Sequence, residues 1–327
     1  MKIIAGIIGM GIGQKHLEAI DKYKGSIVKT ICEKNEKKIK LLKKKYSDKI
    51  ITRNENDIFL DKNINLISIA SYDNYHYSQI LKGLKNNKNL IIEKPLCLNT
   101  TQLRKINDIL KKKPELNITS NLVLRVNSLF KEFKKKISSK KIYYIEGDYI
   151  WGRKEKLVGW RSRIKDYSLI LGAGIHVIDL VMWLTGLRPI SVYACGNKKA
   201  TAGSQYKNNS LVVMLFEFPM DILVKITANG SAIHNHFHEL KIFSKDKTIV
   251  NSNLGSYLYK NKKLSKINAP YPDKSNRKKL IQVFLNNLIK KDNKKIITLK
   301  EQIDLMSACF SAEKSIRLNK KVKIKYL

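Results

Sequence analysis

The chain opens with an apolar run that ends in a cluster of glycines. Residues 2–8 are almost entirely apolar, and Gly9, Gly11 and Gly13 follow before Lys15. Glycines weaken an apolar helix and no small-residue cleavage site follows, so the pattern does not fit a signal peptide. It predicts a buried strand that runs into a glycine turn and then a helix.

Strands and helices alternate in this way up to residue 121. Short apolar runs separated by segments of helical periodicity predict an α/β fold, a doubly wound Rossmann-type parallel sheet covered on both faces. The predicted strands are Lys2–Ile8, Ser26–Cys32, Ile64–Ala70, Asn89–Ile92 and Ile118–Asn121. The predicted helices are Gln14–Tyr23, Asn35–Tyr46, Tyr75–Lys85 and Thr100–Lys112.

The pattern changes after residue 121. Long alternating runs predict a large, mainly antiparallel open sheet with helices on one side, which is an α+β domain. We therefore expect two closely joined domains, residues 1–121 and residues 122–327. The predicted strands are Ile142–Ile150, Pro189–Cys195, Ser210–Phe218, Ile222–Asn229 and Glu239–Phe243, and the predicted helices are Ser128–Ile137, Leu280–Leu288 and Ile303–Leu318.

The charge of the chain is unusually positive. Its 327 residues include 64 Lys and Arg against 27 Asp and Glu, a formal net charge of +37. Such a charge suits a nucleic-acid binder. However, lysine supplies nearly all of it and is spread along the chain, whereas nucleic-acid recognition usually also recruits arginine. We interpret most of the lysines as solvated surface, with some attraction for small anions such as a phosphorylated substrate.

Other classes are excluded by what the sequence lacks. No stretch approaches the roughly 18–20 apolar residues that span a bilayer. The four cysteines (Cys32, Cys97, Cys195 and Cys309) have no CxxC spacing, which argues against a disulfide scaffold or a zinc knuckle. We expect a cytoplasmic protein with neither a membrane nor a nucleic acid as partner.

The glycine turn predicts a dinucleotide site. Gly9, Met10, Gly11, Ile12 and Gly13 lie between a strand and a helix, where free N–H groups and the absence of side chains let a pyrophosphate approach. Glu33 ends the second strand, where an acid can accept hydrogen bonds from both ribose hydroxyls and repel a 2′-phosphate. The cofactor prediction is therefore NAD, and Lys34 keeps NADP open.

Two further turns follow predicted parallel strands at the edge where ligands bind. Ser71, Asn74 and His76 follow the third strand, and Glu93-Lys94-Pro95 follows the fourth. Pro95 keeps Lys94 out of the helical conformation and fixes its direction. A lysine beside an oxidised nicotinamide loses its proton more readily, because both groups are cationic. Lys94 could then exchange a proton with a substrate hydroxyl while the hydride moves to the cofactor.

A glycine pair begins the most distinctive helix of the second half. In the segment Gly172–Trp183, His176, Asp179 and Trp183 share one helical face. A His and an Asp on one face suit a polyol, with His176 as proton acceptor or hydrogen-bond partner. A backbone-satisfied histidine at a helix start is the structural alternative.

Taken in order, these motifs resemble one known family. They are GIIGMGIGQKH, the acid that ends the second strand, SYDNYH, IIEKP, GDYIWGR, GWR and GAGIHVIDLVMWLTGLRP. They are similar to the glucose–fructose oxidoreductase / inositol dehydrogenase / MocA family, whose members oxidise or reduce sugars, polyols or nucleotide-sugars with NAD or NADP. The resemblance covers essentially the whole chain and implies a Rossmann domain followed by an α/β domain, whose open sheet often joins subunits into a homodimer or homotetramer.

The resemblance also implies roles for individual residues. The family's catalytic lysine and helix histidine fall on Lys94 and His176, and its substrate-contacting acid falls on Asp179. Cofactor contacts fall on the glycine turn, the two turns after the third and fourth strands, and the Trp160-Arg161 pair. Further candidates for substrate binding are Arg125, Tyr149, Arg153 and Lys156.

One position departs from the family pattern. Its dehydrogenases carry an Asp one helical turn before the histidine, where this chain has Gly172. Three consequences stay open: Asp179 could orient the imidazole instead, Lys94 could be the sole proton shuttle, or the protein could bind NAD without turnover as a redox regulator.

A run of histidines invites a metal interpretation. His234, His236 and His238 would point the same way on a strand, but no Cys or carboxylate completes the set, because Glu239 faces the opposite side. We predict no metal site.

The sequence therefore predicts an NAD(P)-dependent oxidoreductase acting on CH–OH groups. The substrate that we favour is a sugar or nucleotide-sugar in surface-polysaccharide or sugar biosynthesis, and an inositol-like polyol is the alternative. We expect Lys94 and His176 to flank one sugar carbon against the nicotinamide ring.

Overall fold

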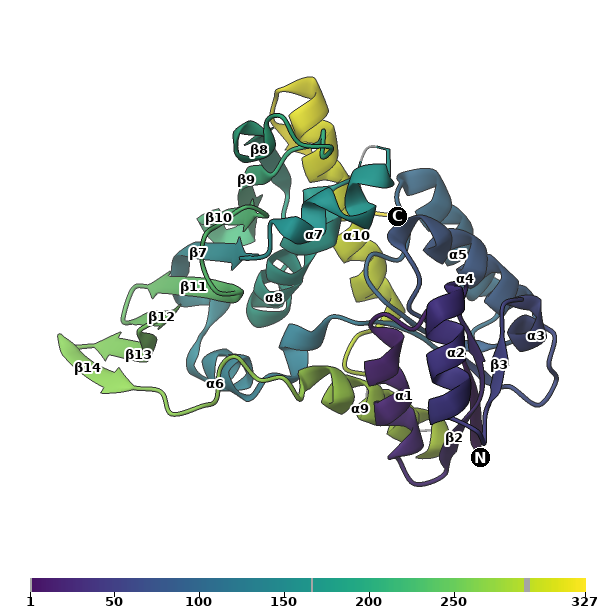
Figure 1. Cartoon of the computed structure of the whole chain (residues 1–327). Coiled ribbons are helices and arrows are strands. Elements are labelled where there is room, and N and C mark those ends of the chain that lie inside the picture. Colours follow the sequence, from purple (N-terminus) through teal and green to yellow (C-terminus); the bar gives the residue numbers. More distant parts are fainter. Residues whose placement is uncertain (1, 166, 291–294) are drawn as a thin grey trace. The chain divides into compact units, whose positions relative to one another are not determined.

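The computed structural model describes residues 2–165, 167–290 and 295–327, and the chain divides into two compact units (Figure 1). The first unit comprises Met1–Val123 and Lys274–Ile303, and the second comprises Leu124–Asp273 and Asp304–Leu327. The predicted boundary at residue 121 lies close to the first crossing. Residues 274–303, which we predicted in the second domain, return to the first unit.

The first unit contains a six-stranded parallel sheet. Its order, β3-β2-β1-β4-β5-β6, is that of a Rossmann fold and confirms the predicted fold class. The short strand β3 escaped prediction because three residues give no periodic signal. The strands are β1 (Ile3–Ile8), β2 (Ser26–Cys32), β3 (Ile50–Thr52), β4 (Leu66–Ile69), β5 (Asn89–Ile92) and β6 (Ile118–Ser120).

Helices supply the core on both faces of this sheet. Leu17, Leu42 and Leu285, from three different helices, join one buried cluster with Ile3 and Ile31 of the sheet. Glycine at position 83 lets α4 approach Leu90 of β5 on the other face. The helices are α1 (Gly13–Asp21), α2 (Glu36–Lys45), α3 (Asn56–Phe59), α4 (His76–Lys85), α5 (Thr100–Lys112) and α9 (Asn276–Lys290).

Helix α2 shows how the fold accommodates so many lysines. Asn35 caps the helix by accepting a hydrogen bond from the Lys38 backbone N–H at 3.0 Å. Leu42 is its buried residue, and three lysines occupy the last turn, where they complement the helix dipole. Lysine on such a face costs the fold little, which agrees with our interpretation of the net charge.

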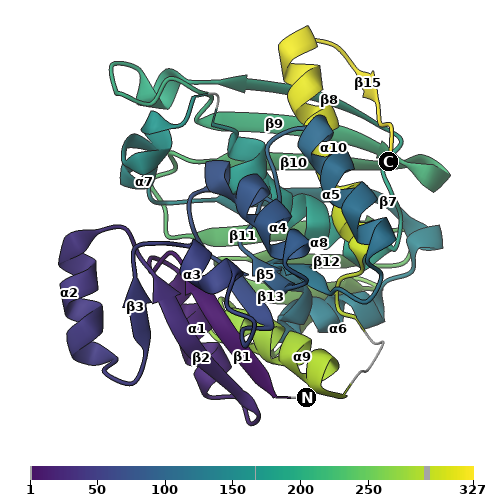
Figure 2. The ribbon, with the colours of Figure 1, turned by 90° about the vertical axis from the view of Figure 1, so that its right-hand side faces the viewer.

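The second unit contains a nine-stranded sheet in the order β14-β13-β12-β11-β7-β10-β9-β8-β15. Strands β7 and β10 pair in parallel and the other neighbours are antiparallel, so the predicted open, mainly antiparallel sheet is confirmed. Figure 2 shows β8, β9 and β10 side by side. The strands are β7 (Ile142–Ile150), β8 (Ser191–Asn197), β9 (Leu211–Phe218), β10 (Ile222–Asn229), β11 (Phe237–Ser244), β12 (Thr248–Ser252), β13 (Gly255–Lys260), β14 (Lys263–Lys266) and β15 (Val322–Lys323).

Helix α8 lies close against one face of this sheet (Figure 1). A Cβ on Gly147 of β7 would lie 2.6 Å from the Val177 side chain, so glycine is what lets the helix approach. The π-helical segment η5 (Ile170–Gly174) leads directly into α8. Helix α8 spans Ile175–Thr185, and further helices of this unit include α6 (Ser128–Lys136), α7 (Glu155–Val158), η2 (Val123–Val126), η4 (Trp160–Arg163) and most of α10 (Leu299–Leu318).

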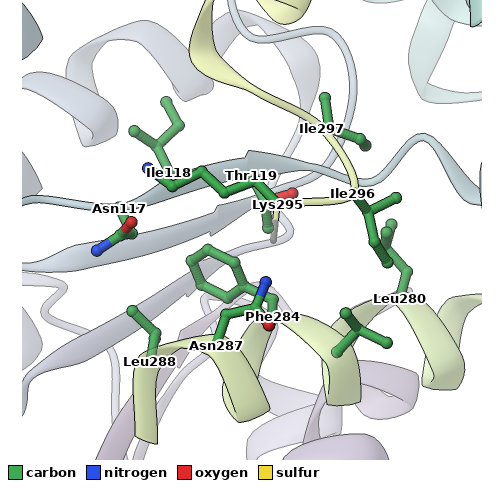
Figure 3. Close-up of a pocket in the computed structure, with 11 residues that line it drawn as sticks. Asn117, Ile118, Thr119, Leu280, Phe284, Asn287, Leu288, Lys295, Ile296 and Ile297 are labelled. Atoms are coloured by element: carbon green, nitrogen blue, oxygen red, sulfur yellow. The ribbon is translucent and has the colours of Figure 1, made fainter. Parts of the chain in front are cut away.

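Strand β6 forms one edge of the first sheet, and a buried glutamine completes its hydrogen bonds. Gln302 accepts a hydrogen bond from the Ser120 N–H at 2.8 Å and donates to the Ile118 carbonyl at 3.2 Å. Beside it, β6, α9 and residues 295–297 surround a small hollow (Figure 3). Its volume of about 30 Å³ suits a single water molecule and no larger ligand.

No helix among the described residues is long and apolar enough to cross a membrane.

Gln302→Leu should destabilise the protein by about 1–3 kcal/mol, because it leaves a buried N–H and a buried carbonyl without partners. Urea unfolding measures this free energy. Lys105→Leu, on the exposed side of α5, is the matched control and should change it little. Equal stability of the two variants would contradict a role for Gln302 at the sheet edge.

Candidate functional site

The glycine turn has the backbone geometry of a phosphate-binding loop. Gly9 has a φ of +88°, and a Cβ there would lie 2.7 Å from the Ala70 carbonyl oxygen. Both the backbone conformation and the lack of space therefore exclude a side chain. A Cβ on Gly11 would meet no described atom within 4 Å, which leaves the turn open to a ligand. Helix α1 begins here with Ile12 at its N-cap and no side-chain cap, so its first N–H groups are available to an anion.

Glu33, the predicted ribose-binding acid, lies beside this turn. Its carboxylate accepts hydrogen bonds from the backbone N–H groups of Met10 at 3.1 Å, Lys34 at 2.8 Å and Asn35 at 3.0 Å. These three bonds fix the carboxylate at the end of β2. Lys38 approaches the same carboxylate at 3.8 Å, so a cation adjoins the acid.

An open hollow adjoins Glu33 on the side of α2. Its volume is about 410 Å³, within the range of small-molecule sites. Met10, Leu41 and Leu42 give it an apolar wall, and Lys38 and Lys45 contribute to its rim. A hollow of this size, with an apolar wall and a basic rim, has the character of a small-molecule site.

Glu93 sits in a buried polar network at the ends of the central strands. It receives hydrogen bonds from His16 Nε2 at 3.0 Å, from the Asn121 side chain and from Arg277 Nε at 3.2 Å. His16 is fully buried, and its Nδ1 lies 2.8 Å from the Ser68 hydroxyl. Burial alone would raise the pKa of Glu93, but the His16 hydrogen bond and the Arg277 charge hold this pKa well below the usual range of a glutamate.

The network explains how Lys94 is held. Lys94 is partly exposed and follows Glu93, so the anchored carboxylate fixes the start of its turn. On the other side, His76 Nδ1 lies 2.6 Å from the Pro95 carbonyl and His76 Nε2 lies 3.2 Å from the Ser71 carbonyl. His76 thus joins the two turns through their backbones. The Ser71 hydroxyl donates to Gln79, and Asn74 is exposed.

In the second unit, His176 belongs to a cluster of aromatic and histidine rings. Tyr149 stacks on His176 with ring centroids 5.9 Å apart, and it also contacts His236 at 5.2 Å and His238 at 4.8 Å. The Tyr271 hydroxyl lies 2.5 Å from His238 Nδ1. Tyr149 and His176 are thus brought together, as a shared substrate surface requires.

Two histidines of this cluster, His236 and His238, are uncharged near neutral pH. Burial, followed by the charge of Arg153, lowers the pKa of His236 to about 4. Burial also lowers the pKa of His238 well below its usual value. His234 lies in an exposed turn before β11 rather than on the strand. Among the described residues, no three His, Cys, Asp or Glu side chains form a group that could hold a metal ion.

Arg125 and Asp179, both predicted to contact substrate, form a buried ion pair. Arg125 Nη2 donates to Asp179 Oδ1 at 2.7 Å, and Nε reaches both carboxylate oxygens at 3.0–3.1 Å. Both side chains are almost completely buried. The pair connects η2 to α8. The Asp179 carboxylate thus has a structural partner in Arg125.

Trp160 and Arg161 lie on η4, near Trp151 and Tyr167. Arg161 Cζ lies 4.1 Å from the Trp160 ring centroid and 4.9 Å from that of Trp151. Its Nε donates to the Tyr167 hydroxyl at 3.0 Å. Arg153 and Lys156 precede this pair on the same segment, and Gly172 lies directly beneath the Tyr167 hydroxyl.

Sequence reasoning missed several members of these networks. His16, Ser68, Asn121 and Arg277 around Glu93 are up to 184 residues apart from it, and only the tertiary fold brings them together. Tyr167 was also missed, and its place over Gly172 is seen only in the fold.

Two family models cover most of the chain. Residues 3–120 match the model described as an oxidoreductase family with an NAD-binding Rossmann fold, and residues 132–250 match the GFO/IDH/MocA C-terminal domain. The chain belongs to the GFO/IDH/MocA oxidoreductase family. It is thus an NAD-binding oxidoreductase, as the motifs predicted.

Individual relatives of the GFO/IDH/MocA family are distant. The chain is 22% identical over 252 residues to myo-inositol 2-dehydrogenase of Thermotoga maritima, which covers 76% of this chain and 75% of the relative. A structure of scyllo-inositol dehydrogenase from Lactobacillus casei with bound NAD(H) and scyllo-inositol has a TM-score of 0.83 at 18% identity and covers 99% of both chains. UDP-N-acetylglucosamine 3-dehydrogenase from Acidithiobacillus ferrooxidans has a TM-score of 0.80 at 15% identity and covers 97% of this chain and 99% of that one.

Glu93→Gln should destabilise the protein by about 3 kcal/mol, because it leaves the partly buried Arg277 cation facing a neutral amide and weakens the charge-assisted hydrogen bonds that the carboxylate accepts. Chemical unfolding at pH 7 gives the difference. Glu18→Gln breaks only an exposed pair with Lys15 and should cost less than about 1 kcal/mol. A similar loss in both variants would mean that the buried network contributes nothing special.

Stability should fall as the pH drops from 6.5 towards 4, because unfolded His236 takes up a proton that the folded chain excludes. The contribution is fully present above about pH 6.5, where both states are neutral. Allowing for partial exposure, it is on the order of 1 kcal/mol. Thermal unfolding between pH 7 and 5 should show a shallower fall for His236→Gln than for the parent, whereas His234→Gln should follow the parent. Parallel curves for all three proteins would contradict the neutral state of His236.

Proposed function

We propose that this protein is an NAD-dependent dehydrogenase or reductase that acts on a hydroxyl or ketone group of a sugar, with Lys94 as the proton-transferring group. The observation that carries the proposal is the anchoring of the Lys94 turn by Glu93 and His76, at the carboxyl ends of the parallel strands of an NAD-binding domain. The fold places ligands at this edge of the sheet, and Lys94 is partly exposed there.

The residues of the first unit fit the cofactor. Gly9, Gly11 and Gly13 together with the start of α1 would receive the pyrophosphate, and Glu33 would accept the ribose hydroxyls in exchange for some of its backbone bonds. A carboxylate at this place favours NAD, while Lys34 and Lys38 beside it keep NADP as an alternative. Ser71, Asn74 and Trp160 remain predicted cofactor contacts.

Proton transfer is the task that remains for the chain's own residues. The nicotinamide, when bound, supplies the acceptor or donor of the hydride. As the carbinol carbon loses its hydride, the Lys94 amine takes the hydroxyl proton and a ketone forms; in reduction the ammonium returns that proton. His176, presented beside Tyr149 by α8, would accept a hydrogen bond from a second hydroxyl of the sugar or share the proton.

The substrate that we favour is a nucleotide-sugar of surface-polysaccharide or sugar biosynthesis. The basic residues Arg153 and Lys156 lie in the unit that carries His176, and the net charge of +37 attracts anions. The likeness to a UDP-N-acetylglucosamine 3-dehydrogenase supports this choice. The likeness to inositol dehydrogenases supports the alternative, a polyol dehydrogenase.

The open sheet of the second unit would join copies of the chain into a homodimer or homotetramer. On its outer face Leu215, Leu223 and Tyr193 are each at least 40% exposed. Between them Lys225 and Lys241 both pair with Glu146, and Lys225 also pairs with Asp148 at 3.7 Å. Apolar side chains around neutral ion pairs suit a self-complementary interface.

Lys94→Ala should abolish turnover, at least a hundredfold, while NADH binding changes little, because the amine moves the proton and the glycine turn holds the cofactor. Absorbance at 340 nm with a panel of sugars, polyols and nucleotide-sugars measures turnover, and fluorescence titration measures NADH binding. Lys85→Ala, an exposed lysine of α4, is the control and should behave like the parent.

Three results would count against the proposal in different ways. Unchanged turnover of Lys94→Ala would remove Lys94 from the reaction. NADH binding without turnover across the whole panel would favour the alternative of a redox-sensing regulator. Salt-sensitive binding of DNA or RNA together with no NADH binding would favour a nucleic-acid binder.

A further inference from the structure

Three cations, Arg153, Lys156 and Arg161, lie together in the segment between β7 and η5, where Glu155 is the one carboxylate among the described residues. The Lys156 backbone N–H donates to the Arg153 carbonyl at 3.0 Å, and Arg161 Nη1 donates to the Lys156 carbonyl at 3.3 Å, so the three residues belong to one compact set of turns. Among the described residues no carboxylate forms an ion pair with any of them. Burial and then the charges of Arg153 and Arg161 lower the pKa of Lys156, and the charge of Glu155 opposes this shift only in part. An arrangement of this kind is electropositive unless an anion binds to it.

Arg161 is held in one orientation. Its guanidinium lies against the rings of Trp160 and Trp151, and its Nε donates to the Tyr167 hydroxyl. Within the described part of the chain its Nη2 has no hydrogen-bond partner. Aromatic packing and the Nε bond fix the guanidinium plane, so little conformational entropy is lost when the remaining N–H groups bind an oxyanion.

Gly172 is what allows Tyr167 to hold Arg161. A Cβ on Gly172 would lie 1.8 Å from the Tyr167 hydroxyl oxygen and 2.7 Å from Cζ, so any side chain would displace the phenol. Tyr167 is only 5% exposed, and its ring packs edge-to-face against Trp160 and Tyr206. At the glycine that departs from the family pattern, the space of a side chain is thus occupied by the Tyr167 hydroxyl.

Arg153 connects this segment to the histidine cluster. A Cβ on Gly152 would lie 1.8 Å from the His234 carbonyl oxygen, so the chain before Arg153 packs directly on the turn that carries His236. The Arg153 Nε is shielded from solvent and has no hydrogen-bond partner among the residues that the structure describes. A buried N–H donor of a cation without a partner points to a ligand, because leaving it unsatisfied is costly.

We propose that Arg153, Lys156 and Arg161 bind a phosphate-type oxyanion of the substrate, and that Tyr167, seated on Gly172, is the residue that positions Arg161. This inference rests on the proposed function and narrows its substrate class to sugars that carry a phosphate or diphosphate. Arg161 would supply a planar pair of N–H donors and Lys156 a point charge, a combination suited to phosphate oxygens.

Calorimetric titration of the full chain tests the site independently of turnover. The probes are UDP for a nucleotide diphosphate, glucose 1-phosphate for a sugar monophosphate, and NADH. The parent should bind at least one of the first two at low salt, and Arg161→Gln should weaken that binding at least tenfold while NADH binding changes less than twofold. Lys85→Gln, an exposed lysine in the first unit, is the charge-matched control and should bind all probes like the parent.

The positioning role of Tyr167 needs its own variants. Tyr167→Phe keeps the ring but loses the acceptor of Arg161 Nε, so phosphate binding should weaken several-fold with normal thermal stability. Gly172→Ala should weaken it at least as much, and Tyr167→Phe keeps the test decisive if the alanine variant does not fold. Unchanged phosphate binding in Tyr167→Phe would contradict the positioning role.

Other outcomes separate the site from the proposed function. If the parent binds neither phosphate probe, or if Arg161→Gln weakens NADH rather than the phosphate probes, the site is not a substrate oxyanion site. If Arg161-dependent phosphate binding is found but no sugar is turned over, the site stands and the proposed dehydrogenase activity fails.

Discussion

The buried carboxylate of Glu93 is the constraint on which the first unit depends. A charge at this depth is tolerated only when it is paired and hydrogen-bonded, and here the partners come from α1, from the residue that follows β6 and from α9. Meeting that requirement draws together the ends of two neighbouring strands and two helices. The next residue is Lys94, so the same bonds that satisfy the carboxylate fix the backbone from which the proposed proton-transferring amine extends. The turn that contains Glu93 and Lys94 thus serves both the stability of the fold and the proposed chemistry.

The second unit also buries polar side chains, but most of them are uncharged rings. Tyr149 contacts three histidines, and burial keeps His236 and His238 neutral. The neutral histidines therefore neither repel nor neutralise the nearby cations Arg153 and Lys156. In the same unit, Arg125 and Asp179 neutralise each other in the core. Positive charge is thus left unbalanced at the segment that includes Arg153 and Arg161, where an anion could be recognised.

Local patterns in the sequence were sufficient for much of the fold. Helix α5 has the predicted bounds Thr100–Lys112, and the glycine turn lies between a strand and a helix as predicted. These features depend on residues within one or two turns of each other. The partners of Glu93 could not be predicted in the same way, because Arg277 is 184 residues distant and nothing in its local pattern marks it. Likewise, Asp179 shares a helical face with His176 as expected, yet only the fold shows that Arg125 binds its carboxylate.

The return of residues 274–303 to the first unit has a consequence for how this chain can be divided. Helix α9 buries Ile281, Leu285 and Leu288 in the same core as α1 and β1, and it carries Arg277. A fragment that ended at residue 121 would expose that apolar surface to water and leave Glu93 without its arginine. The covalent chain passes between the units three times. The stretch that matches the NAD-binding family model, residues 3–120, is therefore shorter than the compact unit to which it belongs, and a single-domain version of that unit would need α9 attached through a new connection.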